Sequence, residues 1–191
     1  MNRVTGLILA GGLARRMGGG DKGLRKFRGK HMVAHAIDRL APQVDTLLIN
    51  ANQNREAYAL LGYPVIADII DGYAGPLAGM HAGLISCTTP LLVTAPCDSP
   101  FLPLDLVARL GATLETERAQ LAVPHSGGYG QPVFALCRRE VVDSLSAFLN
   151  GGGRKVDAWY AALHVVEVPF PDEMSFANIN TLDELERLEH Q

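Results

Sequence analysis

The sequence VTGLILAGGLARRMGGGDK at residues 4–22 decides the fold that we expect. Residues 4–10 form a short, nearly continuous apolar run that ends at two glycines, which is typical of a strand buried on both faces of a parallel sheet. A loop rich in glycine and basic residues follows and continues to Lys30. Eight of the 20 glycines lie in the first 30 residues, so this segment needs backbone that turns sharply or approaches a ligand closely.

Apolar runs alternate with helical patterns along the rest of the chain. We expect strands at residues 46–49, 65–67, 91–95, 121–123, 132–136 and 165–168. We expect helices at residues 32–40, 55–61, 78–85, 104–114, 141–149, 154–163 and 181–189. This alternation predicts right-handed βαβ units, and therefore an α/β fold with three Rossmann-like layers, a mostly parallel sheet and a single domain over residues 1–191.

The overall charge argues against two classes of partner. The chain has 17 basic and 20 acidic residues, a net charge of −3 with neutral histidines, and 48% hydrophobic residues. This composition is ordinary for a folded domain, and the mildly acidic balance predicts no nucleic-acid partner and no membrane-surface partner.

The cysteines and the apolar segments predict a soluble, cytoplasmic protein. Cys87, Cys97 and Cys137 include no CxxC pair, which favours reduced thiols over a disulfide framework or a zinc site. The run at 4–10 is short and lacks the cleavage context of a signal peptide. Residues 72–97 contain no charged residue, but their prolines and glycines exclude a helix long enough to cross a membrane.

Polar or glycine residues follow several of the predicted strands. Gly11 and Gly12 follow the first strand, and Asn50, Asp68 and Asp98 stand at the ends of later ones. Ligands of parallel α/β sheets bind at the carboxyl ends of strands, near a switch in strand order. We therefore expect the functional site there, although Asn50, Asp68 and Asp98 are also suitable turn residues or helix caps.

Three interpretations of the glycine-rich loop compete. The Walker A spacing is absent, and a literal GxGxxG at residues 18–23 begins too far from the strand and opens no helix. In the third interpretation, glycine backbone N–H groups face a nucleotide, while Arg15 or Arg16 and Lys22 bring positive charge to a triphosphate. A solvated basic loop without a ligand is the alternative, which the spacing of these residues disfavours.

The signature LAGG-xxx-RMGG-x-DK at residues 9–22 resembles the molybdenum cofactor guanylyltransferase family, within the wider group of nucleotidyltransferases. Further segments match in order and spacing: residues 50–52, 68, 75–79, 96–98 and 176–181. The resemblance implies the nucleotide-diphospho-sugar transferase type of fold. It also implies a nucleotide-binding N-terminal half and a mainly pterin-binding C-terminal half.

The family resemblance implies a particular reaction. GMP would pass from GTP to the terminal phosphate of molybdopterin, with or without molybdenum, and pyrophosphate would leave. Mg²⁺, or alternatively Mn²⁺, would be the cofactor. Transient contacts with molybdenum-inserting proteins or molybdoenzyme chaperones would follow from the use of the product.

The resemblance also implies the site residues. The implied nucleotide-binding residues are Leu9, Ala10, Gly11, Gly12, Lys22, Asn50, Asp68 and Asp98. The implied catalytic residues are Lys22, Asp98 and Arg16, and Asp98 would also hold the metal. The implied pterin-binding residues are Asn178, Asn180, Arg154 and Lys155.

Other functions remain open from the residues alone. A molybdopterin cytidylyltransferase or a sugar-phosphate nucleotidyltransferase would share the glycine-rich opening, although the former tends towards Ala-Ala-Gly, where this chain has Ala10, Gly11 and Gly12. A more distant alternative is a non-catalytic GTP-binding partner protein. A serine hydrolase is not supported, because no Gly-x-Ser-x-Gly motif occurs.

Overall fold

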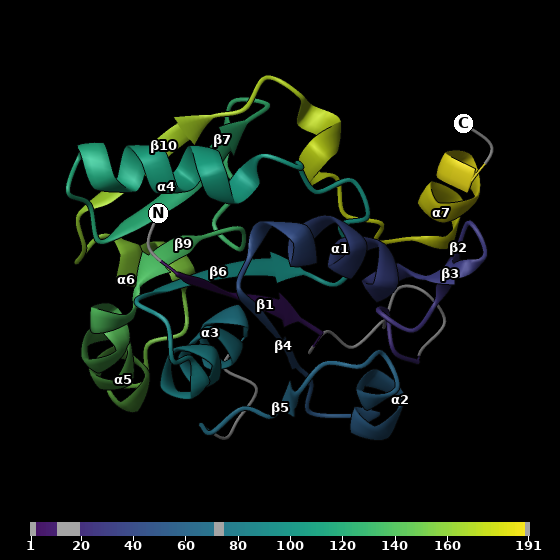
Figure 1. Ribbon diagram of the computed structural model, residues 1–191, viewed down its shortest axis with the longest axis horizontal. Coiled ribbons are helices and arrows are strands. Elements are labelled where there is room, and N and C mark those ends of the chain that lie inside the picture. Colours follow the sequence, from purple (N-terminus) through teal and green to yellow (C-terminus); the bar gives the residue numbers. More distant parts are fainter. Residues whose placement is uncertain (1–2, 11–19, 71–74, 190–191) are drawn as a thin grey trace.

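A mixed sheet forms the middle layer of the computed structural model, which describes residues 3–10, 20–70 and 75–189 (Figure 1). The strand order is β10-β7-β9-β6-β1-β4-β5, with β8 paired to β7. The strands of this sheet are β1 (Val4–Leu9), β4 (Thr46–Asn50), β5 (Val65–Ile66), β6 (Leu91–Pro96), β7 (Leu121–Ser126), β8 (Tyr129–Gly130), β9 (Leu136–Arg138) and β10 (Val165–Pro169).

Helices cover both faces of the sheet. They are α1 (Met32–Leu40), α2 (Arg55–Ala59), α3 (Pro76–Ser86), α4 (Leu106–Thr116), α5 (Val142–Asn150), α6 (Val156–Tyr160) and α7 (Leu182–Glu189). In Figure 1, α1 and α4 lie above the sheet, and α3 and α5 lie below it. The predicted three-layer α/β fold is confirmed.

The central strand β1 contributes side chains to the hydrophobic clusters on both faces of the sheet. Its side chains alternate, so that Val4 and Ile8 join the cluster under α1 and α4, while Leu7 joins the cluster under α3, α5 and α6. This two-sided burial is why the strand is apolar at nearly every position. β1 pairs in parallel with both β4 and β6. The chain therefore leaves β1 to one side and returns on the other, which makes the carboxyl end of β1 the switch point of the sheet.

One predicted strand was misplaced. We expected a strand at 132–136, but the strand is β9, Leu136–Arg138, and it runs antiparallel to β6 and β7. Pro132 has no N–H to give to a ladder, and the residues around it turn instead, with the N–H of Phe134 donating to the carbonyl of Gln131 (3.0 Å).

The predicted helix at 154–163 is shorter in the structure. It is α6, Val156–Tyr160, because Lys155 is extended and the chain beyond Tyr160 closes into tight turns. The other predicted helices agree with the observed ones within a few residues. In the ranges that the structure describes, no helix combines the length and the hydropathy needed to cross a membrane.

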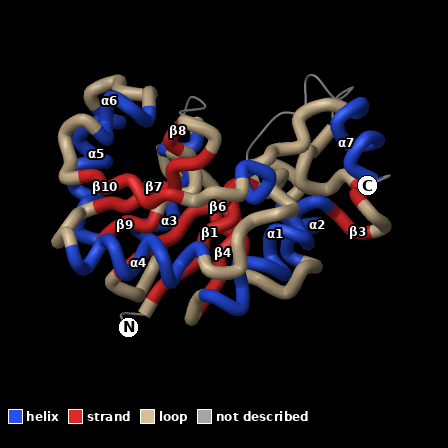
Figure 2. Tube along the Cα trace, turned by 90° about the horizontal axis from the view of Figure 1, so that it is seen from above, coloured by secondary structure: helices blue, strands red, loops and turns tan. Residues whose placement is uncertain are grey.

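A small lobe joins a segment near the start of the chain, residues 26–32, to the C-terminal segment. The loop predicted to run to Lys30 contains a short antiparallel ribbon of β2 (Lys26–Phe27) and β3 (Lys30–His31). Phe27 packs in one cluster with Ile179, Leu185 and Leu188, which belong to α7 and the segment before it. Figures 1 and 2 both show α7 beside this ribbon, at the end of the molecule away from β10. This packing places the C-terminal segment next to the loop that contains Lys22.

Candidate active site

The ends of three parallel strands meet at one edge of the sheet. Leu9 at the end of β1 is level with Asn50 of β4 and with Pro96 of β6. The N–H of Ala10 donates to the carbonyl of Asn50 (2.8 Å), and the N–H of Cys97 donates to the carbonyl of Leu9 (3.1 Å). The structure therefore brings together the predicted residues Leu9, Ala10 and Asn50 at the switch point.

Lys22, Asp98 and Asn180 form a cluster at this edge. The Lys22 Nζ donates to Asp98 Oδ2 in an ion pair, and it donates to Asn180 Oδ1 at 2.5 Å. The side chains of Lys22 and Asp98 are only 14% and 11% exposed, so water screens this pair weakly. The structure thus joins residues predicted for catalysis with one predicted for the pterin, although they lie far apart in sequence.

The backbone of the C-terminal segment lies against Asp98. The N–H of Ile179 donates to the carbonyl of Asp98 (3.1 Å), and the Ser99 hydroxyl donates to Asn178 Oδ1 (2.5 Å). Ile179 is fully buried between these contacts. Asn178 and Asn180 therefore flank one buried anchor, and both of their side chains are placed beside the end of β6.

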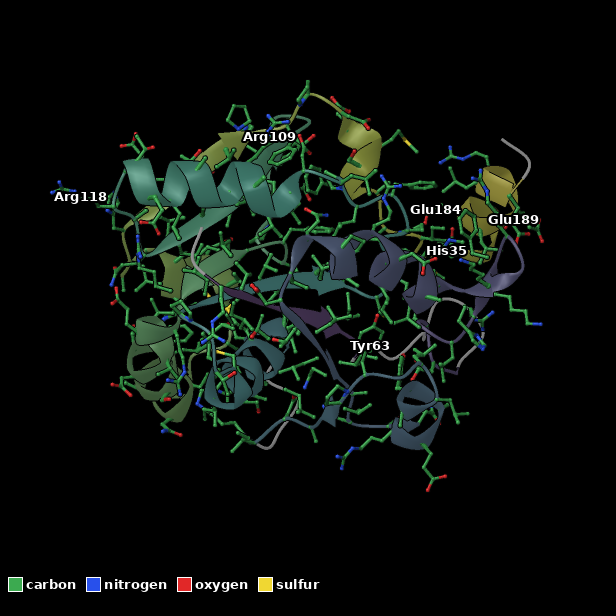
Figure 3. The ribbon with its side chains drawn as sticks, viewed as in Figure 1. His35, Tyr63, Arg109, Arg118, Glu184 and Glu189 are labelled. Atoms are coloured by element: carbon green, nitrogen blue, oxygen red, sulfur yellow. The ribbon has the colours of Figure 1, made fainter. Side chains whose placement is uncertain are left out.

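Helix α7 fixes the backbone of Asn180. Glu184 Oε2 accepts from the N–H groups of Asn180 (2.7 Å) and Thr181 (3.2 Å), while the N–H of Glu184 donates to Thr181 Oγ1 (3.1 Å). This reciprocal pair is a capping box, with Thr181 as the cap of the terminal helix. The hydrogen bond from the Asn180 N–H lowers the pKa of Glu184. Figure 3 shows Glu184 on α7.

Asp68 lies between two asparagine side chains. Asn50 Nδ2 donates to Asp68 Oδ1 (2.9 Å), and Asn52 Nδ2 donates to Asp68 Oδ2 (2.8 Å). Asn52 Oδ1 in turn accepts from the Asp68 N–H (2.9 Å). The predicted residues Asn50 and Asp68 are therefore in direct contact, and Asn52 was missing from the predicted site although it stands in a matching segment.

Gly79 of α3 lies in the segment at residues 75–79 that matches the family, and it packs closely on the ends of two strands. A Cβ at this position would lie 2.6 Å from Leu9 Cδ2 and closer still to Asn50 Oδ1. Only glycine lets α3 pack this closely on the ends of β1 and β4. The helix thus supports Asn50 from below the sheet edge.

Asp21, which directly precedes Lys22 in the sequence, contacts α2 and the residue at its start. Its Oδ1 accepts from the Tyr58 hydroxyl (2.5 Å) and from the Gly23 N–H (3.1 Å), and its Oδ2 accepts from Asn54 Nδ2 (3.1 Å). The sequence pattern did not single out Asp21, Asn54 or Tyr58 as site residues. The available signal was that Asp21 stands beside Lys22 in the LAGG-xxx-RMGG-x-DK signature.

Cys97 is a packed thiol beside this cluster. Burial raises its pKa well above the usual value, and the nearby carboxylates of Asp98 and Asp21 add to the shift. A thiol that stays protonated is a poor nucleophile and a poor metal ligand. Cys97 therefore fills space next to Asp98.

Some predicted residues lie away from the cluster. Arg154 and Lys155 stand on the connection between α5 and α6, where the Arg154 guanidinium donates to the carbonyls of Leu149 (2.9 Å) and Gly153 (2.7 Å). No contact within the described ranges joins Arg154 or Lys155 to Lys22, Asp98 or Asn180. Their predicted role towards the pterin therefore stays a prediction.

Gly11, Gly12 and Arg16 lie outside the residues that the structure describes. Their roles in nucleotide binding and catalysis also stay predictions.

Two surface cavities lie at the opposite edge of the sheet. One, of about 410 Å³, is lined by residues that include Thr5, Thr46 and Tyr63. The other, of about 560 Å³, contains Arg138 and Arg139. The Arg138 guanidinium donates to the carbonyl of Ala119 (2.9 Å) and pairs with Glu115, and the Arg139 guanidinium donates to the carbonyl of Leu84 (3.4 Å).

The mostly parallel sheet, with its switch point at the end of β1 and helices on both faces, gives the chain the fold of the nucleotidyltransferases. CMP:2-keto-3-deoxy-manno-octonic acid synthetase, solved in complex with CTP, shares the fold. Its TM-score is 0.79 over 98% of this chain and 97% of that chain, and its 13% sequence identity limits the likeness to the fold.

The chain belongs to the molybdenum cofactor guanylyltransferase family, which confirms the resemblance seen at residues 9–22. The family model described as MobA-like NTP transferase domain matches residues 6–165. The molybdenum cofactor guanylyltransferase of Cupriavidus metallidurans is 56% identical over 187 residues, which cover 95% of this chain and 92% of that protein. Molybdopterin-guanine dinucleotide biosynthesis protein A from Archaeoglobus fulgidus has a TM-score of 0.81 and 26% identity, with 97% of each chain covered.

Proposed function

We propose that this protein joins GMP from GTP to the terminal phosphate of molybdopterin. An oxygen of that phosphate bonds to the α-phosphorus of GTP, the bond from the α-phosphorus to the bridging oxygen breaks, and pyrophosphate leaves with the electron pair. The second pKa of a phosphate monoester is about 6, so the nucleophile is largely dianionic at neutral pH and needs no strong base. The family membership of the chain and the Lys22–Asp98–Asn180 cluster support this proposal.

Lys22 neutralises phosphate charge in this proposal. Two polyanions must approach each other, and a lysine in a poorly screened site stabilises the charge that develops on the leaving pyrophosphate. The low exposure of Lys22 and its placement beside the ends of β1 and β6 suit this role. We assign Arg16 of the loop the same task.

The oxygens of Asp98 and Asn180 fit a divalent cation. Both already accept hydrogen bonds from one ammonium group, so they form a pair of oxygen donors suited to a hard cation. Mg²⁺ or Mn²⁺ held there would neutralise charge on the triphosphate oxygens. Within the described ranges, no group of three or more His, Cys, Asp and Glu residues could hold a metal. We assign the metal to Asp98 with help from Asn180, and the other ligands of magnesium typically come from phosphate and water.

The remaining contacts divide between the two substrates. We assign the nucleoside of GTP to Asn50 and Asp68, and the backbone of Leu9 to Gly12 to the nucleotide. We assign the pterin to Asn178, Asn180, Arg154 and Lys155. The contact of Asn180 with Lys22 supports a pterin phosphate held next to the triphosphate.

The cellular setting is a further part of this proposal. We propose a cytoplasmic location, since Cys87, Cys97 and Cys137 are all buried free thiols. We also propose transient contacts with molybdenum-inserting proteins or molybdoenzyme chaperones. Co-purification of tagged protein with such partners would support these contacts, and their absence after crosslinking would contradict them.

Release of pyrophosphate tests the role of Asp98. We expect purified protein with GTP, MgCl₂ and molybdopterin to release pyrophosphate, and Asp98→Asn to slow this release by about a hundredfold or more. Asp38→Asn is a matched control, because it changes an exposed carboxylate that pairs with Lys30 on the surface. Normal turnover of folded Asp98→Asn protein would remove Asp98 from the mechanism.

A further inference from the structure

Lys22 stands between two residues that are each tied to a different helix. On one side, the Asp21 carboxylate accepts from Tyr58 and Asn54 of the α2 region. On the other side, the carbonyl of Gly23 accepts from the N–H of Val33 in α1 (3.0 Å). The backbone of Lys22 is therefore held from both directions, while its side chain extends to Asp98 and Asn180.

We infer that Tyr58 and Asp21 form a clasp that positions Lys22 for nucleotidyl transfer. The role of Lys22 in this inference rests on the proposed function. Among the residues that the structure describes, Tyr58 contacts Asp21 and not Lys22, so it acts through the Asp21 carboxylate and is a positioning residue.

The Tyr58 hydroxyl is a buried donor to Asp21. Its side chain is fully buried in the core cluster shared by α1 and α4, so the ring holds the hydroxyl in place. Burial, followed by the nearby Cys97 and Asp21, raises the pKa of Tyr58 far above its usual value. The hydroxyl therefore keeps its proton and donates to Asp21 throughout the neutral range.

Gly23 makes room for this hydrogen bond. A Cβ at position 23 would lie 2.5 Å from the Tyr58 hydroxyl and 3.1 Å from Cys97 Sγ. Any side chain there would push the hydroxyl from Asp21 or displace the loop. The glycine that follows Lys22 and the tyrosine of α2 thus depend on each other.

Asn54 offers a second way to loosen the clasp. It is exposed, donates to the other oxygen of Asp21, and has a φ of 52°. Glycine accepts this backbone conformation without strain. The substitution Asn54→Gly therefore removes the side-chain amide that donates to Asp21 and leaves the start of α2 intact. This variant keeps the inference testable if Tyr58→Phe folds poorly.

The first test needs no substrate. The order of the Lys22 side chain is measured by NMR on ¹⁵N- and ¹³C-labelled lysine in the nucleotide-free protein. We expect Tyr58→Phe and Asn54→Gly to increase the mobility of Lys22 while leaving the fold intact. Tyr63→Phe is the matched control, because Tyr63 lines the cavity at the opposite edge of the sheet. Wild-type order of Lys22 in folded Tyr58→Phe protein would overturn the clasp.

The second test links the clasp to turnover. We expect Tyr58→Phe to lower kcat/KM for GTP about tenfold, as for loss of a hydrogen bond to a charged group. In a Lys22→Met background, Tyr58→Phe should cause no further loss, because its effect passes through Lys22. Full additivity of the two losses would contradict the inference. A mobile Lys22 with unchanged turnover would instead support the clasp and contradict the proposed role of Lys22.

Discussion

Lys22 occupies the oxygens that we assign to the metal. Its ammonium group donates to both Asp98 Oδ2 and Asn180 Oδ1 in a weakly exposed site. We expect a divalent cation at these oxygens to displace the ammonium from Asp98, because two like charges in a weakly screened site repel each other. Lys22 would then move to the phosphates, so nucleotide and metal binding favour each other.

Replacement of Lys22 tests this competition. We expect Lys22→Met to raise the Mn²⁺ affinity of the nucleotide-free protein about tenfold, because a buried positive charge next to the donors is removed. The measurement is a titration followed by electron paramagnetic resonance of free Mn²⁺. Lys30→Met, which changes an exposed ion pair, should leave the affinity as it is. An unchanged affinity in Lys22→Met would contradict the shared use of these oxygens.

Gly79 gives a second prediction at the scale of single residues. The methyl group of Gly79→Ala would overlap Leu9 and Asn50, so α3 must shift or Asn50 must move away from Asp68. We expect a loss of about 1–3 kcal/mol in the free energy of unfolding, measured in urea, together with weaker GTP binding.

Gly111 is the matched control for this change. It lies in the interior of α4, where the nearest atom to an added Cβ is Leu136 Cδ2 at 3.8 Å. Gly111→Ala should therefore be neutral or stabilise the protein by up to about 1 kcal/mol. Equal effects of the two substitutions would show that Gly79 has no special packing role.

At the scale of elements, α7 connects helix capping with the active site. Glu184 caps the helix and also accepts from the backbone of Asn180, whose side chain contacts Lys22. The hydrogen bond from Asn180 lowers the pKa of Glu184 below its usual 4.5. Its stabilising effect is therefore present above that pH and is lost as the pH falls through the lowered value.

This pH dependence predicts that the start of α7 opens locally in acid. We expect the amide hydrogens of Asn180 and Thr181 to exchange faster, relative to the rest of the chain, as the pH is lowered below about 4.5. Glu184→Gln should give much of this loss of protection already at neutral pH. Glu186→Gln, at an exposed position of the same helix, is the control. Equal protection of Asn180 in Glu184→Gln and wild-type protein would contradict the capping role.

For the whole molecule, the sequence predicted the features that depend on local patterns. The apolar run at 4–10, the polar strand ends and the alternation of elements gave the parallel α/β order and the edge that carries the site. They also placed Asn50 and Asp68 near each other, because parallel strands end at the same edge. The strand β9 was predicted a few residues too early and without its antiparallel direction, since Pro132 displaces its start and its neighbours set its direction.

Contacts between distant segments could not be predicted from such patterns. Lys22 and Asn180 are 158 residues apart, and their contact depends on the packing of α7 on the β2-β3 ribbon. Tyr58 belongs to a short helix whose pattern predicts burial but gives no partner for the hydroxyl. Asp21 is adjacent to a predicted site residue, yet its role requires knowledge of where α2 lies.

The identity of the dinucleotide product tests the central claim most directly. The protein is incubated with molybdopterin, MgCl₂ and equal concentrations of GTP and CTP. The pterin products are then identified by their masses in mass spectrometry. We expect the molybdopterin guanine dinucleotide as the main product, with equimolar pyrophosphate. Formation of the cytosine dinucleotide instead, or binding of GTP with no dinucleotide product, would contradict guanylyl transfer by this protein.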